Sequence, residues 1–458
     1  MKAGKLPLTP ENWIFSGGAT PEWKAVHGKR AQDALAKLRE IRGEFVKRAP
    51  QSVRRRGYLA GLDLLLKSAG PARDRLLGDP TLDYWLFLWD KHFHLPGDDD
   101  NWHLHFGMLQ GLAAALALQE NRTVKLDAVL DPDGHFHLYG LPLQLRFHRA
   151  HALKRVVVSV GPRGVKIEGE GLGKAELVKS REVIPGLRVE KCGLLAVQGV
   201  VMHGLASPSE PELDRFAASL RVAFAHVEER DPGLREELAD LVRVLVPLVN
   251  PRDYGSVSSS YVNMRGTICL SHSDDPLLQA ETLIHEFCHQ KMNQLLLVDP
   301  ILEPGQSGQV FYSPWRPDAR RLRGLTLGAH AFLNVARYLQ KSLSRENYPL
   351  RERIAIMTNV TRRLFEVEQA VNSLCAHGDL TEFGRRFALG MARETAMGFH
   401  AAQWYPKLLV DEVRAACEKH RADHSLPLTH FHRLKDYDSF VETIRFGQKR
   451  VIRRRKKK

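Results

Sequence analysis

Two histidines one helical turn apart carry the clearest chemical signal in the chain. They belong to the HExxH motif at 285–289, His-Glu-Phe-Cys-His. Residues four positions apart project from the same face of a helix, so both imidazoles can bind one metal ion. The helix start is well marked, because Asp274 and Asp275 provide an acidic N-cap and Pro276 follows at the first helical position. The sequence therefore predicts a metal-binding helix, whose face toward the protein interior holds Leu278, Thr282, His285, His289, Met292 and Leu296.

A metal site needs a further protein ligand besides these two histidines. The continuation typical of metzincins is absent, since Met292 stands where that pattern requires glycine. His330, in a Gly-rich helical segment downstream, is the preferred third ligand, and Glu366 and Glu368 on the next predicted helix are the carboxylate alternatives. The spacing does not choose the metal. Zn²⁺ with Glu286 as general base would give a peptidase, whereas Fe(II) with open coordination positions would give oxygen chemistry.

Hydrophobic periodicity predicts a mainly helical α+β protein with a β-rich middle region and a helical HExxH metal-binding domain. We expect a helical N-terminal region at 1–120, a β-rich region at 121–208, the metal-binding catalytic domain at 209–445 and a basic, disordered tail at 446–458. The β-rich region should form antiparallel hairpins from runs between 124 and 204, with further strands at 256–271 broken at Gly266. A loop is expected at 94–102, and helices at 30–47, 107–119, 212–226, 233–246, 323–343, 351–375, 379–398 and 409–421.

The composition of the 458 residues, 43% hydrophobic and 26% charged, is ordinary for a globular protein. No apolar run approaches the roughly 18 residues of a membrane-spanning helix, and the N-terminus lacks the signal-peptide pattern. The five cysteines are an odd number without paired spacing, which favours a reducing cytoplasm. Nine basic residues at 445–458 account for most of the formal charge of +14. Because such terminal charge runs are usually solvated, we expect no specific nucleic-acid binding.

Four further histidine pairs have HxH spacing, at 92/94, 103/105, 135/137 and 430/432. On a strand, such a pair points both rings to one face, so each pair offers half of a metal site. His135 and His137 follow the turn sequence DPDG, which predicts an exposed hairpin. We therefore assign none of the four pairs to a metal.

The region around the HExxH motif resembles the HExxH-type, 2-oxoglutarate-dependent peptide β-hydroxylases of ribosomal-peptide natural-product biosynthesis. Their shared pattern is an HExxH helix, a loop with a YxPWR-like element, and a Gly-rich helix that supplies another histidine. In this chain the three elements are the motif at 285–289, the sequence YSPWR at 312–316 and the segment 324–332. The resemblance covers about residues 230–345, and it departs after Arg316, where Asp318-Ala319-Arg320-Arg321 replaces the DPRP of relatives.

This resemblance implies an Fe(II)- and 2-oxoglutarate-dependent dioxygenase that hydroxylates a side-chain β-carbon of a ribosomally made precursor peptide with O₂. His285, His289 and His330 would hold the iron, and Glu286 would orient a ligand or a water. The far carboxylate of 2-oxoglutarate needs a cation, and a guanidinium offers it a bidentate partner. Arg316 is the first candidate, with Arg320 and Arg323 as alternatives, and Tyr312 would line the pocket or pack beside it.

Overall fold

The computed structural model describes residues 13–15, 21–92, 99–131, 134–147, 153–190, 208–250, 255–304, 310–345 and 347–425. Helix makes up 61% and strand 15% of the structure, so the predicted mainly helical α+β class is confirmed. The chain forms two compact units. Of the described residues, the first unit contains 21–228 and 235–286, and the second contains 13–15, 229–234 and 287–425. The predicted basic tail and the run 194–204 lie outside the described residues.

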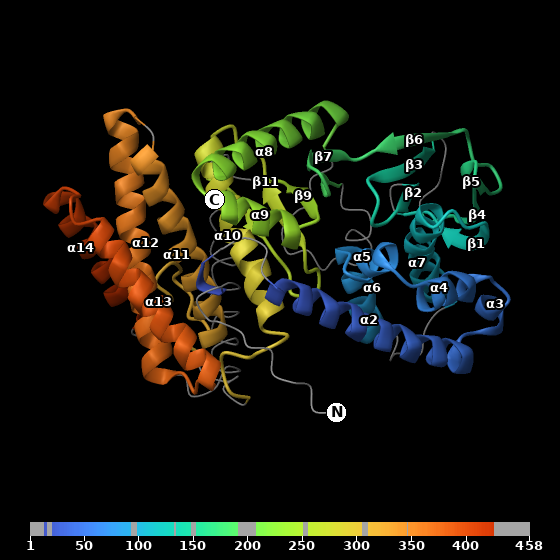
Figure 1. Cartoon of the computed structure of the whole chain (residues 1–458), viewed down its shortest axis with the longest axis horizontal. Coiled ribbons are helices and arrows are strands. Elements are labelled where there is room, and N and C mark those ends of the chain that lie inside the picture. The colour runs from blue at the N-terminus through green and yellow to red at the C-terminus, as the bar shows by residue number, and fades with distance from the viewer. Residues whose placement is uncertain are drawn as a thin grey trace, which may run out of the picture. The chain divides into compact units, whose positions relative to one another are not determined.

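The first unit begins with a helical layer (Figure 1). The central helix of this layer, α7 (Asp99–Gln119), is apolar on nearly all sides, and its residues Phe106, Leu109 and Ala113 are fully buried in the core. It begins at Asp99, so the last part of the predicted loop at 94–102 is helical instead. The helices of this layer are α2 (Pro21–Arg48), α3 (Gln51–Arg54), α4 (Tyr58–Lys67), α5 (Pro71–Leu77), α6 (Pro80–His92) and α7 (Asp99–Gln119).

The β-rich region forms antiparallel sheets, as predicted. One sheet joins β1 (Val124–Val129), β4 (Arg155–Gly161) and β5 (Gly164–Glu168), and another joins β2 (His135–Leu138), β3 (Leu143–Phe147) and β6 (Ala175–Lys179). Helix α7 lies against β1 and β2. Its glycines permit this close approach, because a Cβ on Gly107 would lie 2.3 Å from Val129 and one on Gly111 would lie 2.4 Å from the carbonyl oxygen of His137.

The strands that precede the HExxH helix in the chain form a five-stranded sheet, in the order β10-β11-β9-β8-β7. Its strands are β7 (Arg181–Ile184), β8 (Leu187–Val189), β9 (Val244–Leu248), β10 (Ser258–Ser259) and β11 (Thr267–Ser271), and β9 pairs in parallel with both β8 and β11. The helix predicted at 233–246 is wrong at its end, because α9 (Pro232–Leu241) stops and β9 follows. A short apolar run buried on both faces is typical of parallel strands, and periodicity alone does not separate it from helix.

Helices dominate the second unit, and Figure 1 draws α11 to α14 as a bundle. Its helices are α11 (Leu322–Arg345), α12 (Leu350–His377), α13 (Glu382–Ala401) and α14 (Lys407–Ser425), close to the predicted ranges. Helix α12 packs against the other three. The remaining helices of the described residues are α8 (Glu210–Arg230) and the HExxH helix α10 (Pro276–Leu295).

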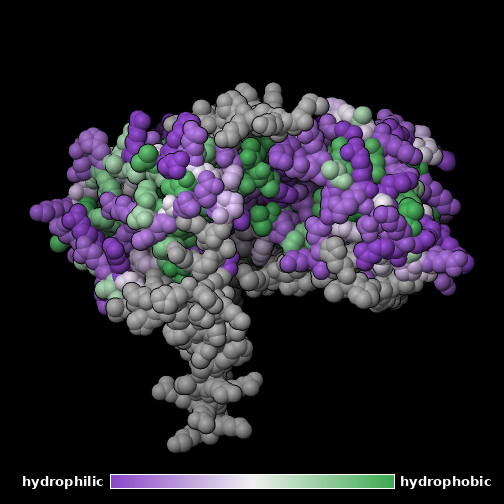
Figure 2. All heavy atoms as spheres, turned by 90° about the horizontal axis from the view of Figure 1, so that it is seen from below, coloured by the Kyte–Doolittle hydropathy of each residue, from purple (hydrophilic) through white to green (hydrophobic). Residues whose placement is uncertain are grey.

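Hydrophilic side chains cover most of the coloured surface in Figure 2, and hydrophobic residues form smaller patches. Among the described helices, none has the length and apolar character needed to cross a membrane. The four described cysteines, Cys269, Cys288, Cys375 and Cys417, form no disulfide.

Candidate metal centre

Helix α10 begins where the sequence predicted. Asp275 caps it, because its Oδ1 accepts hydrogen bonds from the backbone N–H groups of Leu277 and Leu278 at 2.9 and 3.2 Å. Between residues 282 and 295, every residue except His285 and His289 is buried. The face predicted to turn to the interior is therefore half-buried at the two histidines and buried at its neighbours Thr282 and Met292. His285 and His289 form the least enclosed strip of this part of α10.

The HExxH side chains already converge as a metal site requires. The ligand atoms of His285, Glu286 and His289 all lie within 4.8 Å of one another. Glu286 is 3% exposed. Its Oε1 accepts a hydrogen bond from Ser258 Oγ at 2.7 Å, and its Oε2 is buried without a hydrogen-bond partner. An uncompensated buried carboxylate oxygen is costly, so a cation or a water beside Oε2 would satisfy it.

His330 lies outside this three-residue cluster but has the environment of a metal ligand. It is fully buried on α11, and its Nε2 lies 2.8 Å from the Trp13 carbonyl oxygen. Because a carbonyl only accepts, Nε2 carries the proton and Nδ1 carries the lone pair. Nδ1 is buried and has no hydrogen-bond partner among the residues that the structure describes. Burial first, and then the positive charge of Lys291, lowers the pKa of His330 to about 3, so the ring is neutral.

This arrangement matches the usual support of a metal-bound histidine, whose second ring nitrogen donates to a carbonyl or carboxylate. The support comes from an N-terminal segment that sequence reasoning missed. Residues 13–15 present three consecutive carbonyl oxygens, which accept from His330 Nε2 at 2.8 Å, Asn334 Nδ2 at 2.9 Å and Lys291 Nζ at 3.1 Å. Backbone carbonyls leave no residue-type pattern, so no motif could have revealed them.

The two predicted carboxylate alternatives have other surroundings. Glu366 is buried and pairs with Arg363 at 2.7 Å. Burial raises the pKa of Glu366 above its ordinary value, although the Arg363 charge opposes this rise. Glu368 is exposed and lines a different cavity together with residues of α14. Neither glutamate belongs to the cluster formed by the described HExxH residues.

The candidate residues of the loop with the PWR element each have a different partner. Arg316 is 47% exposed, and its Nε donates to Asp318 Oδ1 at 2.8 Å. Arg320 is half-buried, and its backbone pairs with that of Phe311. The Tyr312 hydroxyl lies 2.7 Å from His420 Nδ1, and burial raises the pKa of Tyr312. Each of these three residues therefore has a contact within the loop or with a helix.

Gly328 leaves room for the Trp315 side chain to pack against helix α11. A Cβ on Gly328 would lie 2.2 Å from the Trp315 indole, and that indole also packs on Phe332 with ring centroids 5.3 Å apart. The Trp315 side chain fills the space beside Gly328, so the PWR loop is held against α11 two residues before His330.

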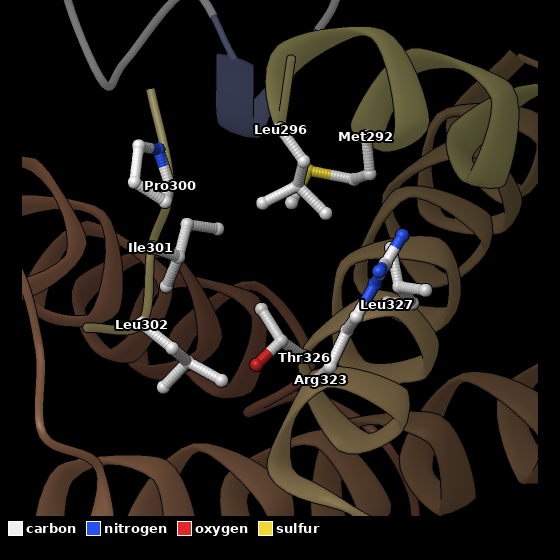
Figure 3. Close-up of a pocket in the computed structure, with 8 residues that line it drawn as sticks. All are labelled: Met292, Leu296, Pro300, Ile301, Leu302, Arg323, Thr326 and Leu327. Carbon is white, nitrogen blue, oxygen red and sulfur yellow. The ribbon is translucent and has the colours of Figure 1, made fainter. Parts of the chain in front are cut away.

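Arg323 differs from the other cations because it lines an apolar pocket (Figure 3). The pocket has a volume of about 200 Å³ and is lined by Met292, Leu296, Pro300, Ile301, Leu302, Arg323, Thr326 and Leu327. Met292 and Leu296 continue the His285 and His289 face of α10 by one and two turns. Arg323 is exposed, and no hydrogen bond or ion pair to it is found within the described part of the chain. Within the described ranges, Arg323 thus offers a guanidinium without an ion pair beside an apolar cavity.

Comparison of this chain with protein-family models and with curated proteins finds no match. The chemistry is therefore inferred from the site. The HExxH cluster offers two half-buried histidines and a buried carboxylate, and the second unit separately offers the buried neutral His330 and a pocket with one cation. These groups suit a divalent metal ion and a small anionic ligand.

Proposed function

We propose that this protein is an Fe(II)- and 2-oxoglutarate-dependent oxygenase that hydroxylates a side-chain β-carbon of a ribosomally synthesised precursor peptide. The observation that carries the proposal is His330, whose Nδ1 is buried without a partner while Nε2 is held by the Trp13 carbonyl. The class of reaction and the peptide substrate rest on the resemblance around the HExxH motif. The described cysteines form no disulfide, and this supports a reducing cytoplasm as the place of the reaction.

In this proposal His285, His289 and His330 hold the metal as neutral imidazoles. When bound, Fe(II) with 2-oxoglutarate and O₂ supplies the oxidant that inserts one oxygen atom into a C–H bond, and 2-oxoglutarate leaves as succinate and CO₂. The buried sides of α10 exclude water, and the strip with His285 and His289 admits the peptide. Glu286, held by Ser258, places a negative charge beside the histidines and orients a ligand or a water.

Arg323 replaces Arg316 as our first candidate for the cation that binds the far carboxylate of 2-oxoglutarate. Arg316 already pairs with Asp318 on the surface, whereas Arg323 borders the apolar pocket. Apolar walls suit the methylene carbons of 2-oxoglutarate, and a guanidinium forms paired hydrogen bonds with a carboxylate. Arg323 also lies seven residues before His330, on the same helix face two turns away.

The second candidate is a zinc metallopeptidase of gluzincin type. The observation that favours it is Glu286, whose free Oε2 belongs to the ligand cluster and could take a proton from a metal-bound water. Against it, Glu366 is occupied by Arg363 and Glu368 is exposed, so neither has the surroundings expected of the third ligand.

The deciding experiment uses full-length protein purified without oxygen and loaded with Fe(II). We expect 2-oxoglutarate to produce a visible charge-transfer band, and O₂ with the precursor peptide to yield succinate and a product heavier by one oxygen atom. His285→Ala and His330→Ala should abolish both band and turnover. Tight stoichiometric zinc, no succinate and a cleaved peptide would replace the oxygenase with the peptidase.

The role of Arg323 in binding the far carboxylate is tested separately, by titrating 2-oxoglutarate into the Fe(II)-loaded protein and following the same charge-transfer band. A hydrogen bond to a charged group contributes about 1.5–3 kcal/mol, so Arg323→Met should weaken 2-oxoglutarate binding by about tenfold or more. Arg316→Met is the matched control and should leave the affinity unchanged. The opposite result would return the anchor to Arg316.

A further inference from the structure

A second group of metal-ligating side chains lies at the turn between β1 and β2. The ligand atoms of Asp131, His135 and His137 lie within 4.8 Å of one another. His137 is 8% and Asp131 2% exposed, and His135 is half-buried. The prediction of an exposed hairpin at this HxH pair is therefore wrong. Asp131 is the residue that sequence reasoning missed, because its turn brings it back beside the strand.

The turn fixes the carboxylate against the two rings. Asp131 Oδ1 accepts from the backbone N–H of His135 at 2.8 Å, and the Asp131 N–H donates to the His135 carbonyl at 2.8 Å. Gly134 has φ +76° and donates its N–H to the Asp131 carbonyl at 3.0 Å. Because side chains alternate along a strand, His135 and His137 share the face that Asp131 meets.

The side chains of this cluster are packed closely together. Asp131 Oδ2 lies 2.6 Å from His137 Nε2, and the His137 ring stacks on Tyr139 with centroids 5.5 Å apart. Arg146, which lies opposite His135 on β3, forms an ion pair with Glu210.

We propose that Asp131, His135 and His137 bind a divalent transition metal ion of the zinc class, separately from the HExxH residues. Two imidazole nitrogens and one carboxylate oxygen are a ligand set that zinc accepts, and three protein ligands leave one position for water. The metal replaces the hydrogen bond between Asp131 and His137. Since metal–ligand distances are about 2.0–2.2 Å, the ligand atoms must draw together, and the half-buried His135 has room to move.

The test uses Co²⁺ as the probe with the full chain carrying His285→Ala and His289→Ala, so that the HExxH residues no longer bind metal. We expect one Co²⁺ per chain with the intense visible absorption of tetrahedral coordination. Adding His137→Ala, His135→Ala or Asp131→Asn should remove this absorption. Each change should weaken binding beyond the roughly 10–100-fold that loss of an outer hydrogen-bond partner costs.

A matched control uses another His–Asp pair, for which the described residues provide no third ligand. His27 Nε2 lies 3.1 Å from Asp240 Oδ2, and His27 is half-buried. His27→Ala should leave Co²⁺ binding unchanged. Asp131→Asn preserves the shape of the turn, and circular dichroism checks that each variant is folded. Absorption that is absent before these changes, or that persists in all three folded variants, would overturn the site.

Discussion

His330 gives the sharpest stability prediction, because its buried ring resists protonation. Its folded-state pKa is about 3, against the ordinary value of 6.5. In metal-free protein between these two values, the unfolded chain therefore binds a proton that the folded chain does not. Stability then falls as the pH falls below 6.5, and the loss ends near the folded-state pKa. From about pH 7 to pH 5, this single group should lower the free energy of unfolding by about 2 kcal/mol.

The comparison variant is His330→Gln, which can still donate to the Trp13 carbonyl but does not titrate. Urea unfolding of α11 is followed by pulsed amide hydrogen exchange with mass spectrometry, so that the second unit is read by itself. Between the two pH values, the wild-type protein should lose about 2 kcal/mol more than His330→Gln. Other titrating groups cancel in this difference. Parallel pH curves for the two proteins would refute the burial and neutrality that we assign to His330.

Two further substitutions test the surroundings of the site, and a third in α2 is a control for the effect of adding a Cβ. Ser258→Ala removes the hydrogen bond to Glu286 and should weaken metal binding by about tenfold in a metal titration. Unchanged affinity would show that Glu286 does not contribute to metal binding. Gly384→Ala would place a Cβ 2.0 Å from the carbonyl oxygen of Ile301, a residue of the Arg323 pocket, and should destabilise the fold by about 2 kcal/mol in urea unfolding. Gly28→Ala in α2, where a Cβ would contact nothing within 4 Å, should instead raise the free energy of unfolding by about 0.5 kcal/mol.

Local sequence rules were sufficient for the elements that carry strong signals. The Asp275 cap and Pro276 marked the start of α10, and turn residues separated the antiparallel hairpins of the β-rich region. They were insufficient for β9, where the run 244–248 becomes a strand because β8 and β11 lie on either side of it. Periodicity describes one segment at a time, so it does not register partners that are distant in sequence.

Some features of the candidate site likewise follow from the sequence, and others follow only from the fold. The sequence by itself determined that His285 and His289 share one helix face, since that follows from the pitch of the helix. Only the tertiary structure decided how exposed these rings are and that the carbonyls of residues 13–15 hold His330 and its neighbours. It also decided that Arg323 borders the pocket and that Asp131 meets His137. Burial, hydrogen bonding and charge pairing depend on groups brought together by folding, and residue types along a chain do not encode those distances directly.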